Sequence, residues 1–156
     1  MDNQTLQEVV TEVLRIVPQR PFLCLPMSAM LYTVLKDRSL AEASLVTGDL
    51  YYKGNPIFKQ DFSIKDAKDG IPETWGGHSW VKADGLIVDI SFFRTLYSDK
   101  FTKPFKLNLI AEFGQGRGCL IVDEQHLPGY ILQYRQVEVL DDDLATGIIK
   151  GYKQLL

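Results

Sequence analysis

Apolar residues recur at helical spacing in two segments near the start of the chain. In the first, Thr5 and Glu8 have the spacing of a capping box, and Pro18 ends the helix that follows. In the second, Pro26 fits the first helical turn, where its missing N–H costs nothing, so we expect Cys24 at the N-terminal edge of this helix. The apolar positions are Leu6, Val9, Val10, Val13 and Leu14 in the first segment and Leu25, Met27, Met30, Leu31, Val34 and Leu35 in the second.

Segments rich in β-branched and aromatic residues predict strands later in the chain. The stretch "ASLVTGDLYY" (43–52) is one, "GGHSWVKADGLIVDIS" (76–91) is typical of a β-hairpin, and "GCLIVD" and "GYILQYRQVEVL" predict two more strands. Residues 54–77 are rich in Gly and Pro and predict an irregular loop, which is too long for a simple connection. The final "DDDLATGIIKGYKQLL" predicts a helix, because its leading acids suit the positive end of the helix dipole.

These elements predict an α+β fold with N-terminal helices packed on an antiparallel, half-barrel-like β-sheet. The chain has 156 residues, of which 46% are hydrophobic and 24% charged, the size and composition of one domain with a sizeable core. No internal repeat and no linker rich in Pro, Gly or Ser divides the sequence. We therefore expect a single domain over residues 1–156.

Charge and cysteine content argue against several function classes. The net charge of −3 comes from interspersed acids and bases, with no basic stripe for a nucleic-acid partner. The first residues lack the pattern of a signal peptide and no run of about 18 apolar residues occurs, which predicts a cytoplasmic protein with no membrane partner. Two cysteines and two histidines are too few for a disulfide scaffold and make a poor zinc set, so we expect no metal.

The register of the hairpin places three notable side chains together. If Asp84 and Gly85 form the two-residue turn that Asp-Gly favours, Trp80 faces Asp89 across the strands. Alternation then puts His78 on the same face, diagonal to Asp89, with Cβ atoms roughly 7 Å apart and a hydrogen bond within reach. The opposite face is apolar and supplies core residues Val81, Val88 and Ile90.

A histidine held by an aspartate suits nucleophilic catalysis. The carboxylate accepts from one ring nitrogen and stabilises imidazolium, which leaves the other nitrogen to take a proton from a nucleophile. Cys24 is the candidate nucleophile, because a helix N-terminus and a nearby imidazolium both favour thiolate over a free thiol with a pKa of about 8.5. The backbone N–H of Cys24 and the side-chain amide of Gln19 are candidate oxyanion donors.

The order of these residues resembles the transglutaminase-like branch of the papain-like cysteine-enzyme superfamily. A Cys at a helix start, a strand with "LVTG", then "HSWV" and an aspartate on the next strand carry the resemblance, over roughly residues 22–93. Bacterial proteins of this kind include proteins classed as peptidases and the leader-peptide proteases of lasso-peptide pathways. The resemblance implies a papain-like (cysteine proteinase) fold, with Cys24 as nucleophile, His78 as general base and acid, and Asp89 as the orienting group.

One departure from the resemblance bears on the reaction. Animal transglutaminases usually have a Gly two residues before the Cys and a Trp directly after it, whereas this chain has Phe22 and Leu25. Hydrolysis or another acyl transfer is therefore favoured over protein crosslinking.

The sequence thus predicts a cysteine-dependent amide or peptide hydrolase or acyltransferase that works through a thioester acyl-enzyme, without a cofactor. Its substrate would be a peptide or a small acyl donor. The alternative is a catalytically inactive member of the fold that binds a peptide or protein. A third interpretation, arylamine-type acetyl transfer from a thioester cofactor, is disfavoured because the chain is much shorter than such enzymes usually are.

Each of the two tryptophans allows two interpretations, whereas Cys119 and His126 each have a simple structural one. Trp75 forms either the rim of a substrate cleft or a loop residue packed on the core, and Trp80 either a cleft wall or packing beside Met27. Cys119 lies in an apolar strand and is expected in the core, and His126 precedes a turn and is expected to be exposed.

Overall fold

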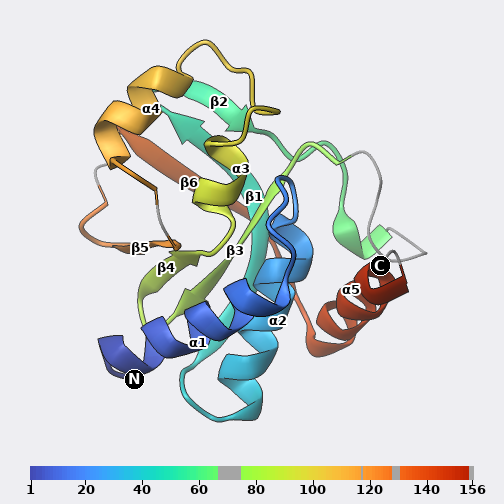
Figure 1. Ribbon diagram of the computed structural model, residues 1–156. Helices are drawn as coiled ribbons and strands as arrows, with labels where there is room; N and C mark the ends of the chain where they lie inside the picture. The colour runs from blue at the N-terminus through green and yellow to red at the C-terminus, as the bar shows by residue number, and fades with distance from the viewer. Residues whose placement is uncertain (67–74, 117, 128–130, 155–156) are drawn as a thin grey trace.

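The structure is a computed structural model that describes residues 1–66, 75–116, 118–127 and 131–154 (Figure 1). Its helices are α1 (Asn3–Ile16), α2 (Cys24–Asp37), η1 (Ile64–Asp66), α3 (Phe92–Leu96), α4 (Lys106–Phe113) and α5 (Asp142–Gln154). Its strands are β1 (Ala43–Tyr52), β2 (Asn55–Phe58), β3 (His78–Ala83), β4 (Leu86–Asp89), β5 (Leu120–Asp123) and β6 (Leu132–Leu140). None of these helices is long and apolar enough to cross a lipid bilayer.

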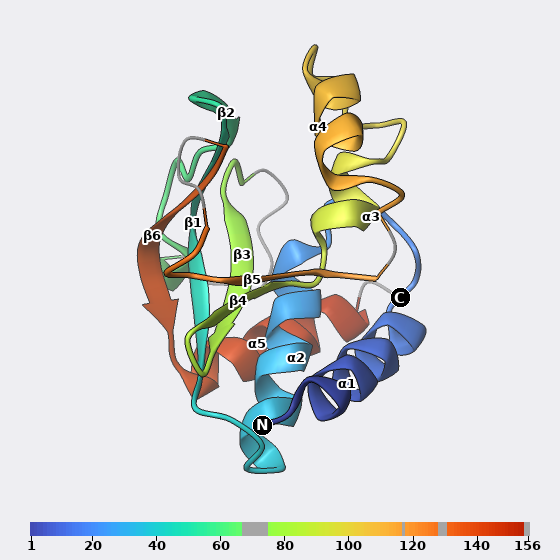
Figure 2. The ribbon, with the colours of Figure 1, turned by 90° about the vertical axis from the view of Figure 1, so that its left-hand side faces the viewer.

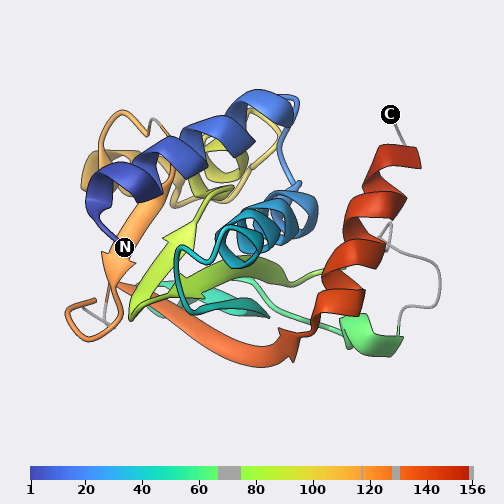
Figure 3. The same cartoon turned by 90° about the horizontal axis from the view of Figure 1, so that it is seen from below.

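The described strands form one antiparallel sheet of six strands. The order is β2-β1-β3-β4-β5, and β6 pairs with β1 along its other edge. Seen from below, the sheet curls around α2, and α1 and α5 lie on the same side of it (Figure 3). The predicted α+β class, with N-terminal helices packed on an antiparallel sheet, is confirmed.

Helix α1 begins earlier than the sequence pattern predicted. The side chain of Asp2 caps it by accepting a hydrogen bond from the backbone N–H of Thr5 at 2.7 Å. The predicted capping box of Thr5 and Glu8 is therefore wrong, because the carboxylate three residues upstream is an equally good cap. The apolar face is as predicted, and Leu6, Val9, Val10 and Val13 are buried.

Helix α2 has the predicted start, strand β1 has the predicted bounds, and together they form the centre of the main core. Cys24 is the first residue of α2, and Pro26 lies in its first turn. Alternate residues of β1 point to α2 and to the opposite face, so Leu45 joins the main core while Val46 joins a smaller cluster. Residues of α1, α2, β3 and α5 complete the main core.

The segment predicted as an irregular loop, residues 54–77, contains regular structure. Lys53 and Gly54 both have positive φ, 47° and 80°, which makes the turn of a hairpin between β1 and β2. Pro56 hid this strand in the sequence, but β2 lies at the end of the sheet, where a proline is tolerated. Residues 67–74 of the predicted loop lie outside the described residues.

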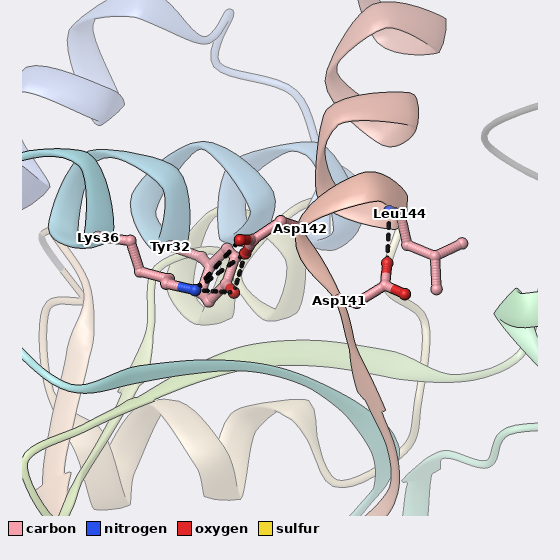
Figure 4. Close-up of polar contacts among 5 residues, drawn as sticks. All are labelled: Tyr32, Lys36, Asp141, Asp142 and Leu144. Atoms are coloured by element: carbon pink, nitrogen blue, oxygen red, sulfur yellow. Dashed lines mark hydrogen bonds and ion pairs between the residues drawn. The ribbon is translucent and has the colours of Figure 1, made fainter.

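Helix α5 ends the described chain and is attached to α2 through its N-terminal turn (Figure 4). Asp141 caps the helix, since its Oδ1 accepts from the N–H of Leu144 at 2.8 Å. Asp142 accepts hydrogen bonds from the hydroxyl of Tyr32 and from Lys36, both on α2. The acidic run therefore has the structural role that the sequence predicted.

Two short helices were not predicted. Helices α3 and α4 lie together at one end of the molecule (Figure 2), and Arg94 of α3 contacts the C-terminal end of α1. They cover a second hydrophobic cluster between α3 and the upper ends of β1 and β6, which includes Leu50, Tyr52, Phe92, Leu96 and Leu132.

Candidate active site

The hairpin of β3 and β4 has the predicted register. Asp84 and Gly85 both have positive φ, 50° and 80°, as a type I′ turn requires. Ala83 pairs with Leu86, which confirms the two-residue turn. Because side chains alternate along each strand, this register decides which residues of β3 and β4 share a face.

His78 and Asp89 meet on that shared face. Nε2 of His78 lies 2.7 Å from Oδ2 of Asp89, and both side chains are fully buried. The ring of Phe58 stacks on the imidazole, with centroids 4.9 Å apart and planes 7° from parallel. The imidazole is thus held at its edge by a carboxylate and on its face by an aromatic ring.

Tyr134 of β6 completes the surroundings of the carboxylate. Its hydroxyl donates to Oδ2 of Asp89 at 2.7 Å, and its ring packs edge-on against Trp80 at 4.9 Å. Tyr134 could not be predicted from the sequence, because β6 and β4 are not neighbours in the sheet and no local spacing connects residues 134 and 89. The only available signal was a buried-type aromatic with a polar tip in a predicted strand.

His78 carries a positive charge at neutral pH. Burial lowers the pKa of His78, but the charge and hydrogen bond of Asp89 outweigh this, and Cys24 adds a smaller effect, so that the pKa rises from 6.5 to about 10. The imidazole is therefore an imidazolium in the folded protein at neutral pH. An imidazolium beside a thiol favours the thiolate.

The backbone before Cys24 is held in an unusual conformation. Phe22 has a φ of 63°, in the left-handed region that favours glycine, and its N–H donates to Oγ1 of Thr95 on α3 at 3.0 Å. Arg94 of α3 also donates to the carbonyls at the end of α1, at 3.0 Å and 2.6 Å. Helix α3, unpredicted, thereby fixes the approach to α2.

The N-terminus of α2 presents Cys24 with backbone donors nearby. Leu23 is the N-cap residue, and no side chain caps the helix. The carbonyl of Leu23 accepts from the N–H of Met27 at 3.1 Å, as in a regular first turn. The N–H of Cys24 and the positive end of the helix dipole thus lie at the thiol.

Cys24 is the first residue of α2, and His78 is the first residue of β3. Cys24 contributes to the raised pKa of His78, which indicates that the thiol lies near the imidazole. The ring nitrogen on the side away from Asp89, Nδ1, is buried and has no hydrogen-bond partner among the described residues. Catalytic hydrogen bonds are often poorly aligned before substrate binds. The three residues of the predicted triad therefore form a contiguous set.

The second cysteine, Cys119, also lies near Asp89. Burial raises the pKa of Cys119 to about 12, and the charge of Asp89 adds to this effect. Cys119 packs against the main core directly before β5. It is a neutral packing thiol, as its apolar sequence context predicted.

The two tryptophans belong to different surroundings. Trp80 is 1% exposed and packs with Val46 and Ile87, on the sheet face opposite Met27. It is therefore neither an open cleft wall nor a neighbour of Met27, because its strand position turns it away from α2. Trp75 is partly buried against the main core and donates from Nε1 to the carbonyl of Phe62 at 3.2 Å.

Gln19 and His126 are both exposed. Gln19 is exposed and lines a hollow of about 610 Å³ together with Arg94 and Tyr97, and neither Cys24 nor His78 lines this hollow. His126 has an 81% exposed side chain paired with Asp123 at 3.1 Å, as its turn context predicted. Among the described residues, no three His, Cys, Asp or Glu side chains are placed to hold a metal ion.

Comparison with protein families, with curated proteins and with solved structures finds no significant match to this chain.

Proposed function

We propose that the chain is a cysteine-dependent amide or peptide hydrolase or acyltransferase of the transglutaminase-like, papain-like kind, in which Cys24, His78 and Asp89 act as a triad. One observation carries the proposal. The buried His78 is held at Nε2 by Asp89, 2.7 Å away, and its other nitrogen is left for Cys24. A packing histidine does not need a buried charge partner together with a thiol at a helix N-terminus.

The reaction follows from this arrangement. The Cys24 thiolate attacks the carbonyl carbon of an amide or ester, and the N–H of Cys24 stabilises the oxygen that becomes negative. The imidazolium of His78 gives its proton to the leaving amine or alcohol as the bond to carbon breaks. Water or an amine then attacks the thioester, His78 accepts its proton, and the product leaves with Cys24 regenerated. Asp89 keeps the ring oriented in every step.

The test is alkylation of Cys24 by iodoacetamide, followed by mass spectrometry. A free thiol reacts about a hundredfold more slowly at about pH 6 than at about pH 8.5, because its thiolate fraction falls. If the proposal is right, the rate of Cys24 alkylation falls less than about tenfold between these two pH values in the wild type. In His78→Gln it falls by the full factor of about a hundred.

Cys119 is the internal control, because its half-buried thiol has a pKa raised to about 12 and should therefore label much more slowly than Cys24 in the folded protein. A labelled Cys24 justifies screening ester and peptide-amide substrates. If native Cys24 responds to pH like a free thiol, the catalytic proposal fails, and an inactive protein that binds a peptide or protein becomes the working hypothesis.

A further inference from the structure

Two donors share one oxygen of the buried carboxylate. Nε2 of His78 and the hydroxyl of Tyr134 both lie 2.7 Å from Oδ2 of Asp89. The other oxygen, Oδ1, is buried and has no hydrogen-bond partner among the described residues. Both hydrogen bonds therefore end on the same oxygen atom. Each donor makes this oxygen a weaker acceptor for the other donor.

Tyr134 is fixed in place as a neutral donor. Burial and the charge of Asp89 raise its pKa well above 10, so the hydroxyl keeps its proton. Its ring packs edge-on against Trp80, and its backbone pairs with Leu50 of β1. The hydroxyl consequently points at Asp89 from a rigid strand.

We propose that Tyr134 is a positioning residue whose hydroxyl fixes Oδ2 of Asp89 and limits how strongly the carboxylate holds the proton of His78. This inference rests on the proposed function for its catalytic meaning, because a histidine that holds its proton too firmly is a poor acid for the leaving group. The hydrogen bond itself requires no substrate.

Four titratable groups surround His78 and its carboxylate. Asp89 on β4 and Cys24 on α2 act on His78 itself, whereas Tyr134 on β6 and Cys119, which precedes β5, are coupled to Asp89. Only Tyr134 donates a hydrogen bond to the carboxylate without itself changing charge over the working pH range. Its removal is thus the cleanest way to alter the carboxylate alone.

The experiment is an NMR titration of the His78 ring in the wild type and in Tyr134→Phe, with the second histidine, His126, assigned by His126→Gln. Phenylalanine keeps the ring against Trp80 and removes only the hydroxyl. Asp89 then has a single donor, and the proton affinity of His78 is expected to rise about three- to tenfold. The matched control is Tyr52→Phe, because the Tyr52 hydroxyl is buried without a partner among the described residues.

A His78 titration that stays in place or moves to lower pH in Tyr134→Phe overturns the inference. If that variant does not fold, 3-fluorotyrosine at position 134 supplies the opposite change, since a more acidic hydroxyl is a stronger donor and should lower the proton affinity of His78. An unchanged or raised affinity there also overturns it.

The kinetic result separates this inference from the proposed function. Tyr134→Phe should slow the turnover of a peptide amide about threefold or more, yet leave iodoacetamide alkylation of Cys24 at about pH 7 within twofold of wild type, because alkylation needs no proton from His78. If the wild type turns over no substrate and Cys24 responds as a free thiol, the proposed function fails, while the NMR titration still decides the role of Tyr134.

Discussion

Gly48 of β1 lies opposite His78 of β3, and a Cβ placed on Gly48 would lie 1.9 Å from the carbonyl oxygen of Arg135 on β6. The register of β1 and β6 shifts at this point, which brings the β6 backbone against Gly48. The strand that carries the imidazole is thus flanked by one that accepts no side chain at this position.

Gly48→Ala should therefore destabilise the fold. The clash is with backbone, which cannot rotate away, and we expect a loss of about 2–3 kcal/mol in the free energy of unfolding, measured by urea denaturation. Gly147→Ala is the matched control, because a Cβ there meets nothing within 4 Å and alanine favours the helix. Equal stability of Gly48→Ala and wild type would show that β6 moves aside.

Removing the charge of Asp89 should weaken the thiolate. Asp89→Asn keeps the size of the side chain but leaves His78 without the negative partner that raises its pKa to about 10. We expect turnover of any identified substrate to fall about a hundredfold or more, and alkylation of Cys24 to gain the pH dependence of a free thiol. Asp123→Asn, which acts on the exposed His126, serves as the control. Full activity in Asp89→Asn would remove the aspartate from the mechanism.

The stability of the protein should fall as the pH rises above neutrality. The pKa of His78 is 6.5 in the unfolded reference and about 10 in the folded state. The ion pair therefore stabilises the fold fully below pH 6.5, and this contribution is lost as the pH rises through 10.

Between about pH 7 and about pH 9, this linkage gives a slope of at most about 1.4 kcal/mol for each pH unit. Urea denaturation at several pH values measures it. His78→Gln should flatten the profile, and His126→Gln should not, since that side chain is exposed. A wild-type profile that is flat or rises would contradict a protonated His78.

The positive φ of Phe22 predicts that glycine is more stable than alanine at this position. Glycine adopts a φ of 63° without strain, whereas alanine keeps the unfavourable contact between Cβ and the backbone. Phe22→Gly should therefore be more stable than Phe22→Ala by about 1 kcal/mol in thermal or urea unfolding. The side chain is 50% exposed, so both variants lose a similar, small amount of packing. Greater stability of the alanine variant would mean that this loop relaxes.

Local signals explain what the sequence could predict. The start of α2 at Cys24, the bounds of β1 and the turn at Asp84 and Gly85 each follow from residues that lie within a few positions of one another. Because side chains alternate along a strand, the position of the turn also predicts that His78 and Asp89 share a face and come into contact.

Long-range pairing explains what the sequence could not predict. Phe58 stacks on His78 from a strand that Pro56 disguised as loop. Tyr134 on β6 contacts Asp89 on β4 although β1 and β3 lie between these strands in the sheet order. No spacing along the chain encodes this arrangement. Thr95, which holds the backbone of Phe22, lies on a five-residue helix too short for a periodic pattern.

The hydrogen bond from Tyr134 to Asp89 spans 45 residues, and it also sets an order of events during synthesis. Because the chain emerges from the ribosome N-terminus first, Cys24, His78 and Asp89 are all present well before β6 is. A nascent chain that stops after β4 holds the three reactive groups but lacks the strand that completes their surroundings. The buried carboxylate therefore gains its second donor only after β6 has been synthesised and has paired with β1.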